Sequence, residues 1–381
     1  MAGFTVNTPS VHDLPAYLSP PEHILIDPEV LNAQLTGRVL SRLPGIPWSL
    51  STDQRSGPRA QASGIDSGKQ NSFILYLKHY KGRFLRYCPG TRNYNCCAYR
   101  IMHIGENCPL NCSYCILKAY FQDRIIKVWA NQEDLFKELE LKLRPGNRLF
   151  RAGTGEFTDS LALEPLTGYT GDLVQFLGNY PNVCLELKSK IINLSWIKKV
   201  SDPSRVLPAW SVNSQEIIKT QEQGSAGLEE RMRAAAGCAA QGFRVCLHFD
   251  PIIHYPGWEK GYALAVETIF DYLRPENIAY LSLGSFRFMP ELEKMLMRDE
   301  SRATYIYNEF ITGLDGKKRL FLPLRLKQFA FIAKHLKDKG LLDRHMYFCM
   351  ESSYVWTKVL GYTPEDLGGL DRHLLRLSFD P

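Results

Sequence analysis

Three cysteines on one short segment are the residues of this chain whose types and spacing most clearly predict chemistry. Cys108, Cys112 and Cys115 are spaced C-x3-C-x2-C. Three thiolates on a tight loop can hold three irons of a [4Fe–4S] cluster and leave the fourth iron open. An open iron can be chelated by the amino and carboxylate groups of S-adenosylmethionine, which an electron from the cluster then cleaves to a 5′-deoxyadenosyl radical. The spacing therefore predicts a cofactor that supplies the reactive radical and a protein that orients this radical toward the substrate.

A zinc knuckle is the alternative use of these thiols. Its ligands would be Cys112 and Cys115 with two of the other cysteines nearby, Cys88, Cys96, Cys97 and Cys108. The usual two pairs of C-x2-C are missing, which favours the cluster over zinc. Tyr114 favours it as well, because a flat side chain just before the third cysteine can place the backbone beside an adenine.

The second group of cysteines, Cys88, Cys96 and Cys97, is an added feature of the chain. These thiols can bind a second cluster, carry redox equivalents or be buried structural groups. Adjacent cysteines seldom ligate one cluster comfortably, so structural thiols are the favoured interpretation, and the other two stay open.

The elements that must position the cysteine loop alternate from about residue 100 onward. Apolar runs predict strands over 100–104, 148–152, 183–188, 205–211, 243–249 and 277–283. Amphipathic runs predict helices over 132–143, 170–179, 194–200, 228–241, 261–273 and 290–297. Six βα units in a row imply an α/β fold with a parallel sheet wound as a barrel of the TIM type or as a partial (βα)6 barrel. The cysteine loop follows the first strand, at the strand ends where such folds place their chemistry.

The chain is expected to divide into three parts. Residues 1–95 mix short apolar runs with proline and predict an irregular N-terminal subdomain, in which 51–71, rich in Ser, Gly, Gln and Arg, is a mobile loop. Residues 96–300 form the barrel, and 301–381 form a small C-terminal extension.

Small and acidic residues follow the second predicted strand. Gly153 and Gly155 let the backbone approach a ligand closely, and Glu156 can accept hydrogen bonds from the methionyl ammonium group. Such a turn is a weak motif by itself, and an ordinary βα turn is the alternative. Its position one unit after the cysteine loop favours a cofactor-binding role.

Polar residues also close the third and fourth predicted strands. Lys188 can pair with the methionyl carboxylate, and Ser211 and Asn213 can bond to ribose or carboxylate oxygens. Polar groups at strand ends can instead cap the next helix, and for Ser211 that alternative is nearly as good.

Composition and charge indicate a soluble enzyme of the cytoplasm. No charged-then-apolar leader occurs in 1–20, no apolar run approaches the roughly 18 residues of a membrane span, and the cysteines do not resemble a secreted disulfide framework. The net charge of +6 favours polyanions only mildly. Basic and aromatic residues alternate over 78–87 and could contact nucleic acid or form a solvated strand face. A second basic run over 316–319 predicts a hairpin or loop tip.

Together these residues resemble a family, the radical S-adenosylmethionine enzymes of the spore photoproduct lyase type, also called radical DNA photolyases. The resemblance runs from about residue 78 to about residue 336. It rests on the cysteine loop, Thr158-Asp159 with Leu166-Thr167, Lys188, Ser211-Val212-Asn213, Pro251 with Gly257-Trp258-Glu259 and Gly261-Tyr262, and Phe286-Arg287-Phe288. It implies that Thr158 joins the cofactor-binding residues.

What the resemblance implies is a partial barrel that cleaves a thymine-dimer adduct in DNA, with a [4Fe–4S] cluster, S-adenosylmethionine and an electron donor such as flavodoxin or ferredoxin. In that reaction the adenosyl radical takes a hydrogen atom from the dimer, the dimer fragments, and a cysteine returns a hydrogen atom.

Two positions depart from the pattern of the family. Glu156 stands where the hydrogen-donating cysteine falls, and a carboxylate has no weak X–H bond to offer a carbon radical. Ile116 stands where a tyrosine follows the third cluster cysteine in the characterised lyases. Cys184, Cys246 and Tyr114 can substitute only if the fold brings one of them into the pocket.

The sequence therefore predicts a radical S-adenosylmethionine enzyme similar to spore photoproduct lyase that acts on a DNA lesion or nucleobase. A radical enzyme acting on RNA or on a small molecule is one alternative, and a non-catalytic zinc or iron–sulfur protein that binds nucleic acid is another. The substrate, the hydrogen-atom donor, the oligomeric state and the reductant are not specified by the sequence.

Overall fold

The computed structural model describes residues 14–51, 73–88, 90–91, 93–121, 125–143, 148–298 and 303–379. The mobile loop expected over 51–71 therefore lies, apart from Ser51, outside the described residues. Within the described ranges, no helix is both long enough and apolar enough to cross a membrane.

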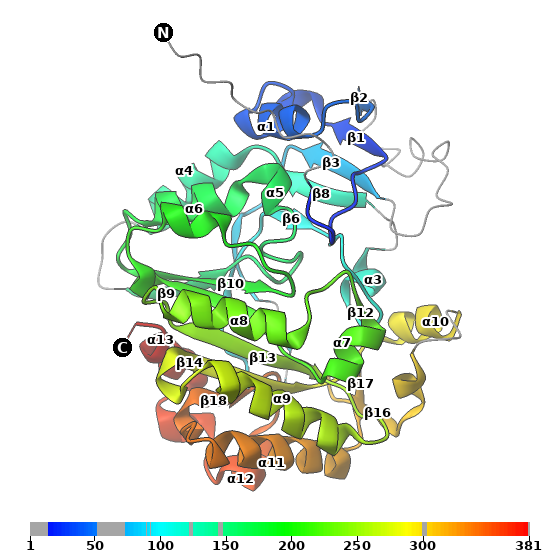
Figure 1. Ribbon diagram of the computed structural model, residues 1–381, viewed down its shortest axis with the longest axis vertical. Helices are drawn as coiled ribbons and strands as arrows, with labels where there is room; N and C mark the ends of the chain where they lie inside the picture. The colour runs from blue at the N-terminus through cyan, green and yellow to red at the C-terminus, as the bar shows by residue number, and fades with distance from the viewer. Residues whose placement is uncertain are drawn as a thin grey trace.

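An eight-stranded sheet in the order β18-β14-β13-β11-β10-β9-β5-β4 forms the centre of the molecule (Figure 1). Its strands are β4 (Leu85–Tyr87), β5 (Arg100–Met102), β9 (Phe150–Gly153), β10 (Val183–Ser189), β11 (Val206–Ser211), β13 (Val245–Ile252), β14 (Ile278–Ser285) and β18 (Met346–Phe348). All neighbours are parallel except β4 and β5. The sheet curls into a half-barrel, which confirms the predicted fold class.

The six predicted strands are confirmed as β5, β9, β10, β11, β13 and β14, with ends that differ by three residues or fewer. Strands such as β11 and β14 are buried along their whole length. That burial explains why they read as continuous apolar runs and not as alternating ones.

Helices cover the sheet where the amphipathic pattern places them. Five of the six predicted helices are present as α4 (Gln132–Lys142), α6 (Tyr169–Leu177), α8 (Leu228–Ala239), α9 (Trp258–Tyr272) and α10 (Pro290–Arg298). The sixth, expected over 194–200, is the 3-10 helix η3 (Ser195–Lys199), which is too short for an α-helical ladder. Helix α8 packs against α9, and α9 packs against α11 (Leu322–Asp338) along one face of the sheet (Figure 1).

A second sheet of five strands stands above the first in the order β2-β1-β3-β8-β6 (Figure 1). Its members are β1 (His23–Ile26), β2 (Trp48–Leu50), β3 (Ile74–Lys78), β6 (Gly105–Glu106) and β8 (Ile125–Trp129). Two of these strands come from beyond residue 95, so this sheet interleaves the N-terminal segment with the barrel. The division expected at residue 95 stays a prediction.

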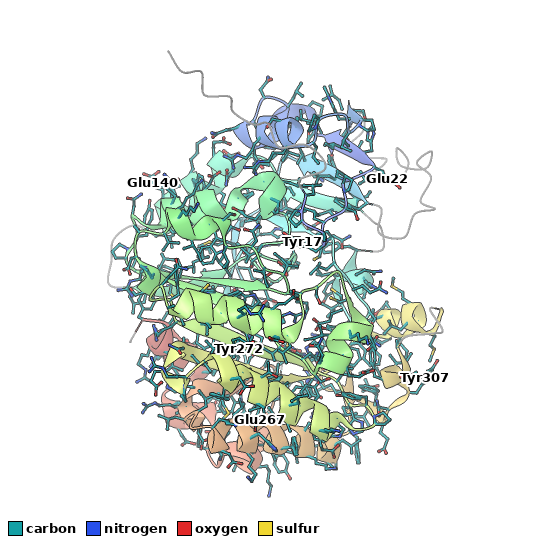
Figure 2. The ribbon with its side chains drawn as sticks, viewed as in Figure 1. Tyr17, Glu22, Glu140, Glu267, Tyr272 and Tyr307 are labelled. Carbon is teal, nitrogen blue, oxygen red and sulfur yellow. The ribbon has the colours of Figure 1, made fainter. Side chains whose placement is uncertain are left out.

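Contacts from helix α1 (Gln34–Arg42) fasten the second sheet to the barrel. Arg38 Nη1 donates to the Thr167 carbonyl and to Asp172 Oδ2, both at 2.6 Å, and Arg42 donates to a carbonyl nearby. Tyr17, near the start of the described chain, lies in the middle of the molecule between the two sheets (Figure 2). The N-terminal segment is thus part of one body with the barrel.

The C-terminal segment extends the main sheet. Strand β18 pairs in parallel with β14, and α11, α12 (Ser353–Leu360) and α13 (Leu370–Phe379) follow it or flank it. The basic run at 316–319 lies in a hairpin between β16 (Phe310–Thr312) and β17 (Lys318–Leu320), as predicted. Arg319 of this run is buried and bonded to Asp315 at 2.7 Å, so it stabilises the hairpin and is not part of a basic surface.

The aromatic residues of the other basic run point mostly inward. Tyr80 stacks on Trp129 with 4.7 Å between ring centroids, and Phe84 is only 2% exposed. Tyr87 is 59% exposed, but its ring is covered by the Arg100 guanidinium at 3.4 Å. Lys81 and Arg83 are exposed, while Tyr80 and Phe84 pack inward, which favours a solvated basic strand over a stacking face for bases.

Candidate active site

The cysteine loop leaves the main sheet at the end of β5, as expected for the first βα unit. It contains β7 (Asn111–Cys112), which pairs antiparallel with β12 (Glu222–Gln223), and ends in the short helix α3 (Leu117–Tyr120). The Asn107 N–H donates to the Phe157 carbonyl at 2.9 Å. The loop is therefore bonded to the turn that follows β9, and the two sequence features predicted to meet do meet.

The three thiols of this loop have the surroundings that iron–sulfur ligands use. Backbone N–H groups of Leu110 and Leu117 hydrogen-bond to the sulfurs of Cys108 and Cys115. Burial raises the pKa of all three thiols, that of Cys112 to about 12. Binding a metal requires these protons to leave.

The donor chemistry of the loop suits an iron–sulfur cluster, because it offers three thiols with N–H donors to sulfur. Among the described residues, however, no three Cys, His, Asp or Glu side chains are arranged for direct metal binding. A [4Fe–4S] cluster binds each of its three cysteines through a different iron, so it does not require the single-ion arrangement of ligands.

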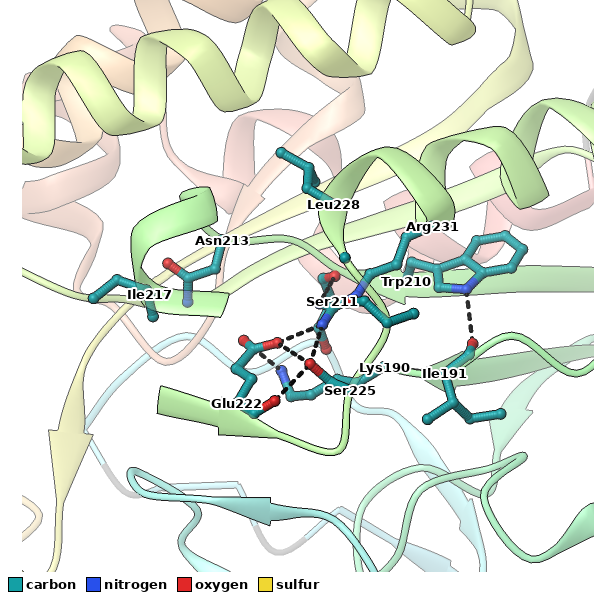
Figure 3. Close-up of polar contacts among 12 residues, drawn as sticks. Lys190, Ile191, Trp210, Ser211, Asn213, Ile217, Glu222, Ser225, Leu228 and Arg231 are labelled. Carbon is teal, nitrogen blue, oxygen red and sulfur yellow. Dashed lines mark hydrogen bonds and ion pairs between the residues drawn. The ribbon is translucent and has the colours of Figure 1, made fainter. Parts of the chain in front are cut away.

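Behind the loop lies a buried charged network centred on Glu222 (Figure 3). Arg231 Nη2 donates to Glu222 Oε2 at 2.5 Å, and Lys190 Nζ lies 3.3 Å from Oε1. The Tyr114 hydroxyl donates to the same carboxylate, while Arg231 also donates to the Ser211 carbonyl at 2.8 Å. Burial by itself would raise the pKa of Glu222, but Arg231 and Lys190 lower it to about 2. Tyr114 and Ser211 are therefore tied into the support of the loop.

The glycines after β9 are required by packing. A Cβ on Gly153 would lie 1.7 Å from the Tyr99 hydroxyl oxygen and 2.4 Å from the Glu186 carbonyl oxygen. A Cβ on Gly155 would lie 2.9 Å from Cβ of Lys188. Both glycines let the turn press against β10, which brings the next residue of the turn over the strand end.

Glu156 and Lys188 form an ion pair at that point. Lys188 Nζ lies 2.8 Å from Glu156 Oε1, and both side chains line an internal cavity of about 100 Å³. Burial would lower the pKa of Lys188, but Glu156 raises it well above its ordinary value. The sequence predicted that these two residues would share one site, and the structure brings them together.

Further charged residues line the same cavity and were missed by sequence reasoning. Glu186 and Lys188 lie two positions apart on β10 and so share a face, a period-two signal that could have found Glu186. His248 Nε2 lies 3.1 Å from Glu186 Oε1, and Arg151 Nη1 lies 3.4 Å from Oε2. Burial would raise the pKa of Glu186, but these partners and Tyr280 lower it to about 2.

A second ion pair in the cavity joins Asp250 and Arg287. Arg287 Nη1 lies 3.4 Å from Asp250 Oδ1, and Arg287 Nη2 donates to Cys349 Sγ at 3.4 Å. Burial opposes ionisation of Asp250, yet Arg287 and Lys188 hold its pKa below the ordinary value. Cys349 comes from the C-terminal segment, and no pattern in the sequence connects it with the barrel.

The remaining predicted residues lie outside the lining of this cavity. Asn213 Nδ2 donates to the Pro251 carbonyl at 2.9 Å, and its Oδ1 accepts from the Tyr262 hydroxyl at 2.6 Å. Thr158 is buried, and its hydroxyl has no hydrogen-bond partner among the described residues. The Asn213 amide is thus engaged by the fold, whereas the hydroxyl of Thr158 keeps its capacity to bind.

An α/β half-barrel with a three-cysteine loop after its first strand defines the radical S-adenosylmethionine class of proteins. The model of the spore photoproduct lyase family matches residues 94–304, more than half of the chain. The chain therefore belongs to the spore photoproduct lyase family.

Individual relatives are distant in sequence. The spore photoproduct lyase of a Geobacillus species is 23% identical over 223 residues, which cover 55% of this chain and 65% of that protein. The Clostridium acetobutylicum lyase is 20% identical over 256 residues, covering 66% and 70%. The match thus spans about 65% of the length of the Geobacillus relative.

Solved structures of the family share the fold. Spore photoproduct lyase complexed with dinucleoside spore photoproduct superposes with a TM-score of 0.71 at 16% identity, covering 87% of this chain and 99% of that one. A variant with bound AdoMet and dinucleoside spore photoproduct gives a TM-score of 0.72 at 16% identity and the same coverage. At this identity the likeness concerns the fold alone.

Proposed function

We propose that the chain is a radical S-adenosylmethionine enzyme that acts on a DNA lesion or nucleobase, as a lyase similar to spore photoproduct lyase. The observation that carries the proposal is the contact between the cysteine loop and the turn that bears Glu156, made by the 2.9 Å hydrogen bond from Asn107 to Phe157. The contact joins the backbone of the loop that carries the three cysteines to the turn that carries Glu156, and the ion pair of Glu156 with Lys188 lines a cavity.

In this proposal Cys108, Cys112 and Cys115 hold a [4Fe–4S] cluster. The cluster and S-adenosylmethionine supply a 5′-deoxyadenosyl radical when both are bound. Burial raises the pKa of Cys112 to about 12; Lys190 and Arg231 oppose this rise, and Glu222 adds to it. Because Arg231 is held by Glu222, the charge next to the loop is fixed in place.

The Glu156–Lys188 pair is suited to the methionyl group of the cofactor. That group carries an ammonium and a carboxylate, so Glu156 accepts from the first and Lys188 donates to the second. Gly153 and Gly155 allow the close approach of this turn, and Thr158 offers a hydroxyl without a partner among the described residues. Tyr114, Ser211 and Asn213 complete the proposed site from the strand ends and the loop.

The proposed substrate and partners follow the family. Two of the related structures are spore photoproduct lyases with bound dinucleoside spore photoproduct, which supports a DNA substrate for this chain. Reduction of the cluster calls for a donor such as flavodoxin or ferredoxin, and the proposed compartment is the cytoplasm. A radical reaction on RNA or on a small molecule is the second candidate, and the small, charged cavity of about 100 Å³ favours the small molecule, because dinucleotide-sized ligands need more room.

The test is anaerobic reconstitution with iron and sulfide, then dithionite and S-adenosylmethionine, with 5′-deoxyadenosine measured in the presence and absence of ultraviolet-irradiated DNA. Deoxyadenosine that rises with irradiated DNA, together with restored thymine, is the expected result. Slow deoxyadenosine that is indifferent to DNA would move the assignment to the second candidate. A reconstituted protein that forms none would contradict the enzymatic proposal altogether.

A further inference from the structure

At position 156, on the turn after β9, the chain has no group that can donate a hydrogen atom to a carbon radical. The residue there is a glutamate, and its carboxylate pairs with Lys188. The same cavity is lined by four thiols, those of Cys88, Cys96, Cys97 and Cys349. These thiols come from two separate segments, one before β5 and one after β18. The fold brings these four thiols to one cavity, and no spacing in the sequence predicts it.

Cys349 is the thiol that the structure holds most firmly toward the ionised groups of the cavity. Its backbone N–H donates to the Leu283 carbonyl at 3.0 Å, which fixes the residue at the end of β18 against β14. The sulfur accepts from Arg287 Nη2 at 3.4 Å, and the Asp250 carboxylate, which pairs with the same arginine, lines the same cavity. Cys349 also interacts electrostatically with Glu156.

The protonation of Cys349 suits a hydrogen-atom donor. Burial and the nearby Asp250 raise the pKa of Cys349 well above its ordinary value. The side chain therefore stays an S–H group at neutral pH, and only the thiol, with its weak S–H bond, can give a hydrogen atom to carbon.

The other three thiols form a connected series. Cys96 is in hydrogen-bond contact with both Cys88 and Cys97, and all three line the same cavity as Cys349. Contact with Cys96 and burial raise the pKa of Cys97, so this thiol too keeps its proton. Cys88 is partly exposed at the other end of the series.

We propose that Cys349 donates the hydrogen atom that quenches a carbon radical in this cavity, and that the series Cys97, Cys96 and Cys88 restores its S–H bond. This inference rests on the proposed function, since it needs a radical reaction in the cavity. It assigns to Cys349 the hydrogen-donating role that the family gives to a cysteine at the position of Glu156.

The step balances as follows in atoms and electrons. The S–H bond of Cys349 breaks homolytically, a C–H bond forms on the radical carbon, and the sulfur keeps one unpaired electron. Hydrogen atoms then pass from Cys97 to Cys349, from Cys96 to Cys97 and from Cys88 to Cys96. A small-molecule thiol of the solution reduces Cys88 by giving it one hydrogen atom, and two such thiyl radicals combine into one disulfide after two turnovers.

The alternatives expected from the sequence do not reach the cavity. Cys184 Sγ donates to the Ser378 carbonyl at 3.4 Å, and Cys246 contacts Tyr280 within the core. The Tyr114 hydroxyl is held by Glu222. None of the three lines the cavity that contains Glu156 and Lys188.

The test uses the reconstituted full chain in D₂O, in which every exchangeable thiol carries deuterium. The variants are Cys349→Ser, which keeps a polar hydrogen-bonding group but has too strong an O–H bond to donate, Cys349→Ala, and the matched control Cys184→Ala. Deuterium is measured in restored thymine with irradiated DNA and in the 5′-deoxyadenosine formed without DNA. Iron content and thermal unfolding establish that each variant folds.

We expect the amount of deuterated product to fall at least tenfold in both Cys349 variants and to stay at the wild-type level in Cys184→Ala. Wild-type amounts of deuterium in Cys349→Ser would overturn the inference and leave the proposed function intact. If the wild type forms the same amount of deoxyadenosine with and without DNA, the proposed DNA substrate is wrong. The deuterium content of deoxyadenosine in the Cys349 variants then still tests whether Cys349 is the hydrogen-atom donor. If no deoxyadenosine forms, both proposals are overturned.

A measurement on the protein without iron examines the thiol series separately from activity. Mild oxidation with diamide followed by peptide mass spectrometry should yield a disulfide within Cys88, Cys96 and Cys97 in the wild type and in Cys349→Ala. If all three thiols stay free although the other accessible thiols of the protein are oxidised, the proposal that hydrogen atoms reach Cys349 through this series is overturned.

Discussion

Glu222 and Cys112 face one another across the antiparallel pair of β12 and β7. The carboxylate of Glu222 is bonded to Arg231 on α8 and to Lys190 beyond β10. The strand that carries the middle cysteine is thus backbone-paired to a residue whose side chain is fixed by two cations from the barrel. The position of the cysteine loop depends on buried electrostatics as well as on its own turns.

Glu222→Gln should destabilise the whole protein because it leaves Arg231 buried without a counter-charge. Both side chains are fully buried at 2.5 Å, and breaking such a pair costs about 3–5 kcal/mol of unfolding free energy. Urea unfolding followed by circular dichroism measures this loss. The control is Glu229→Gln, which weakens an exposed pair with Arg233 at 2.8 Å and should leave the stability nearly unchanged, because solvent screens exposed pairs. Equal losses in the two variants would contradict the role of Glu222.

Acid should destabilise the fold through Glu186. His248, Arg151 and Tyr280 overcome burial and lower its pKa from the ordinary 4.5 to about 2. A lowered folded-state pKa gives stability that is fully present above about pH 4.5 and is lost as the pH falls toward 2. The contribution is about 3 kcal/mol from the size of this shift. Urea midpoints measured between pH 5 and pH 3 should fall less steeply in Glu186→Gln than in the wild type, and parallel curves would refute the assignment.

The parallel sheet was predictable from sequence for a physical reason. Strands such as β11 and β14 are buried on both faces, so each appears as an apolar run between helical patterns. The upper sheet was not predictable in the same way, because β6 has two residues and β8 joins it from beyond the cysteine loop. Pairing between distant short segments leaves no periodic signal.

The candidate site likewise contains some residues that were predictable from the sequence and some that were not. Glu156 and Lys188 were found because they follow strands whose carboxyl ends meet in such folds. Cys349 was missed because it reaches the cavity only when β18 is added beside β14, and a C-terminal strand of three residues carries little pattern. Asn213 was placed at the correct strand end, but its amide is bonded to Pro251 and Tyr262, which no spacing foretells.

Gly153→Ala should destabilise the turn after β9. The added Cβ would lie 2.4 Å from the Glu186 carbonyl oxygen, a backbone atom that cannot move away, so we expect a loss of about 1–3 kcal/mol. Gly237→Ala on α8 is the matched control, because a Cβ there meets nothing within 4 Å and should raise stability by up to about 1 kcal/mol. Thermal unfolding of both variants measures the contrast. A neutral Gly153→Ala would show that the turn can relax.

Lys188→Ala should weaken the binding of S-adenosylmethionine to the reconstituted protein. A hydrogen bond to a charged group contributes about 1.5–3 kcal/mol, so the dissociation constant should rise roughly 10- to 100-fold. Equilibrium dialysis with labelled cofactor measures it. Lys199→Ala is the control, since Lys199 pairs with Asp172 at 2.8 Å on an exposed part of the surface. Unchanged affinity in Lys188→Ala would remove Lys188 from the cofactor site.

Cys112→Ala should abolish cluster assembly without unfolding the barrel. Three thiols of one loop hold three irons, and with two of them the cluster loses an essential ligand. We expect iron to fall from about four per chain to near zero and the brown colour to disappear, as measured by iron and sulfide analysis with visible absorbance. Cys184→Ala is the control, because that thiol is equally buried but bonded to the Ser378 carbonyl at 3.4 Å. A brown Cys112→Ala protein with full iron content would place the cluster on other cysteines and refute the assignment of the loop.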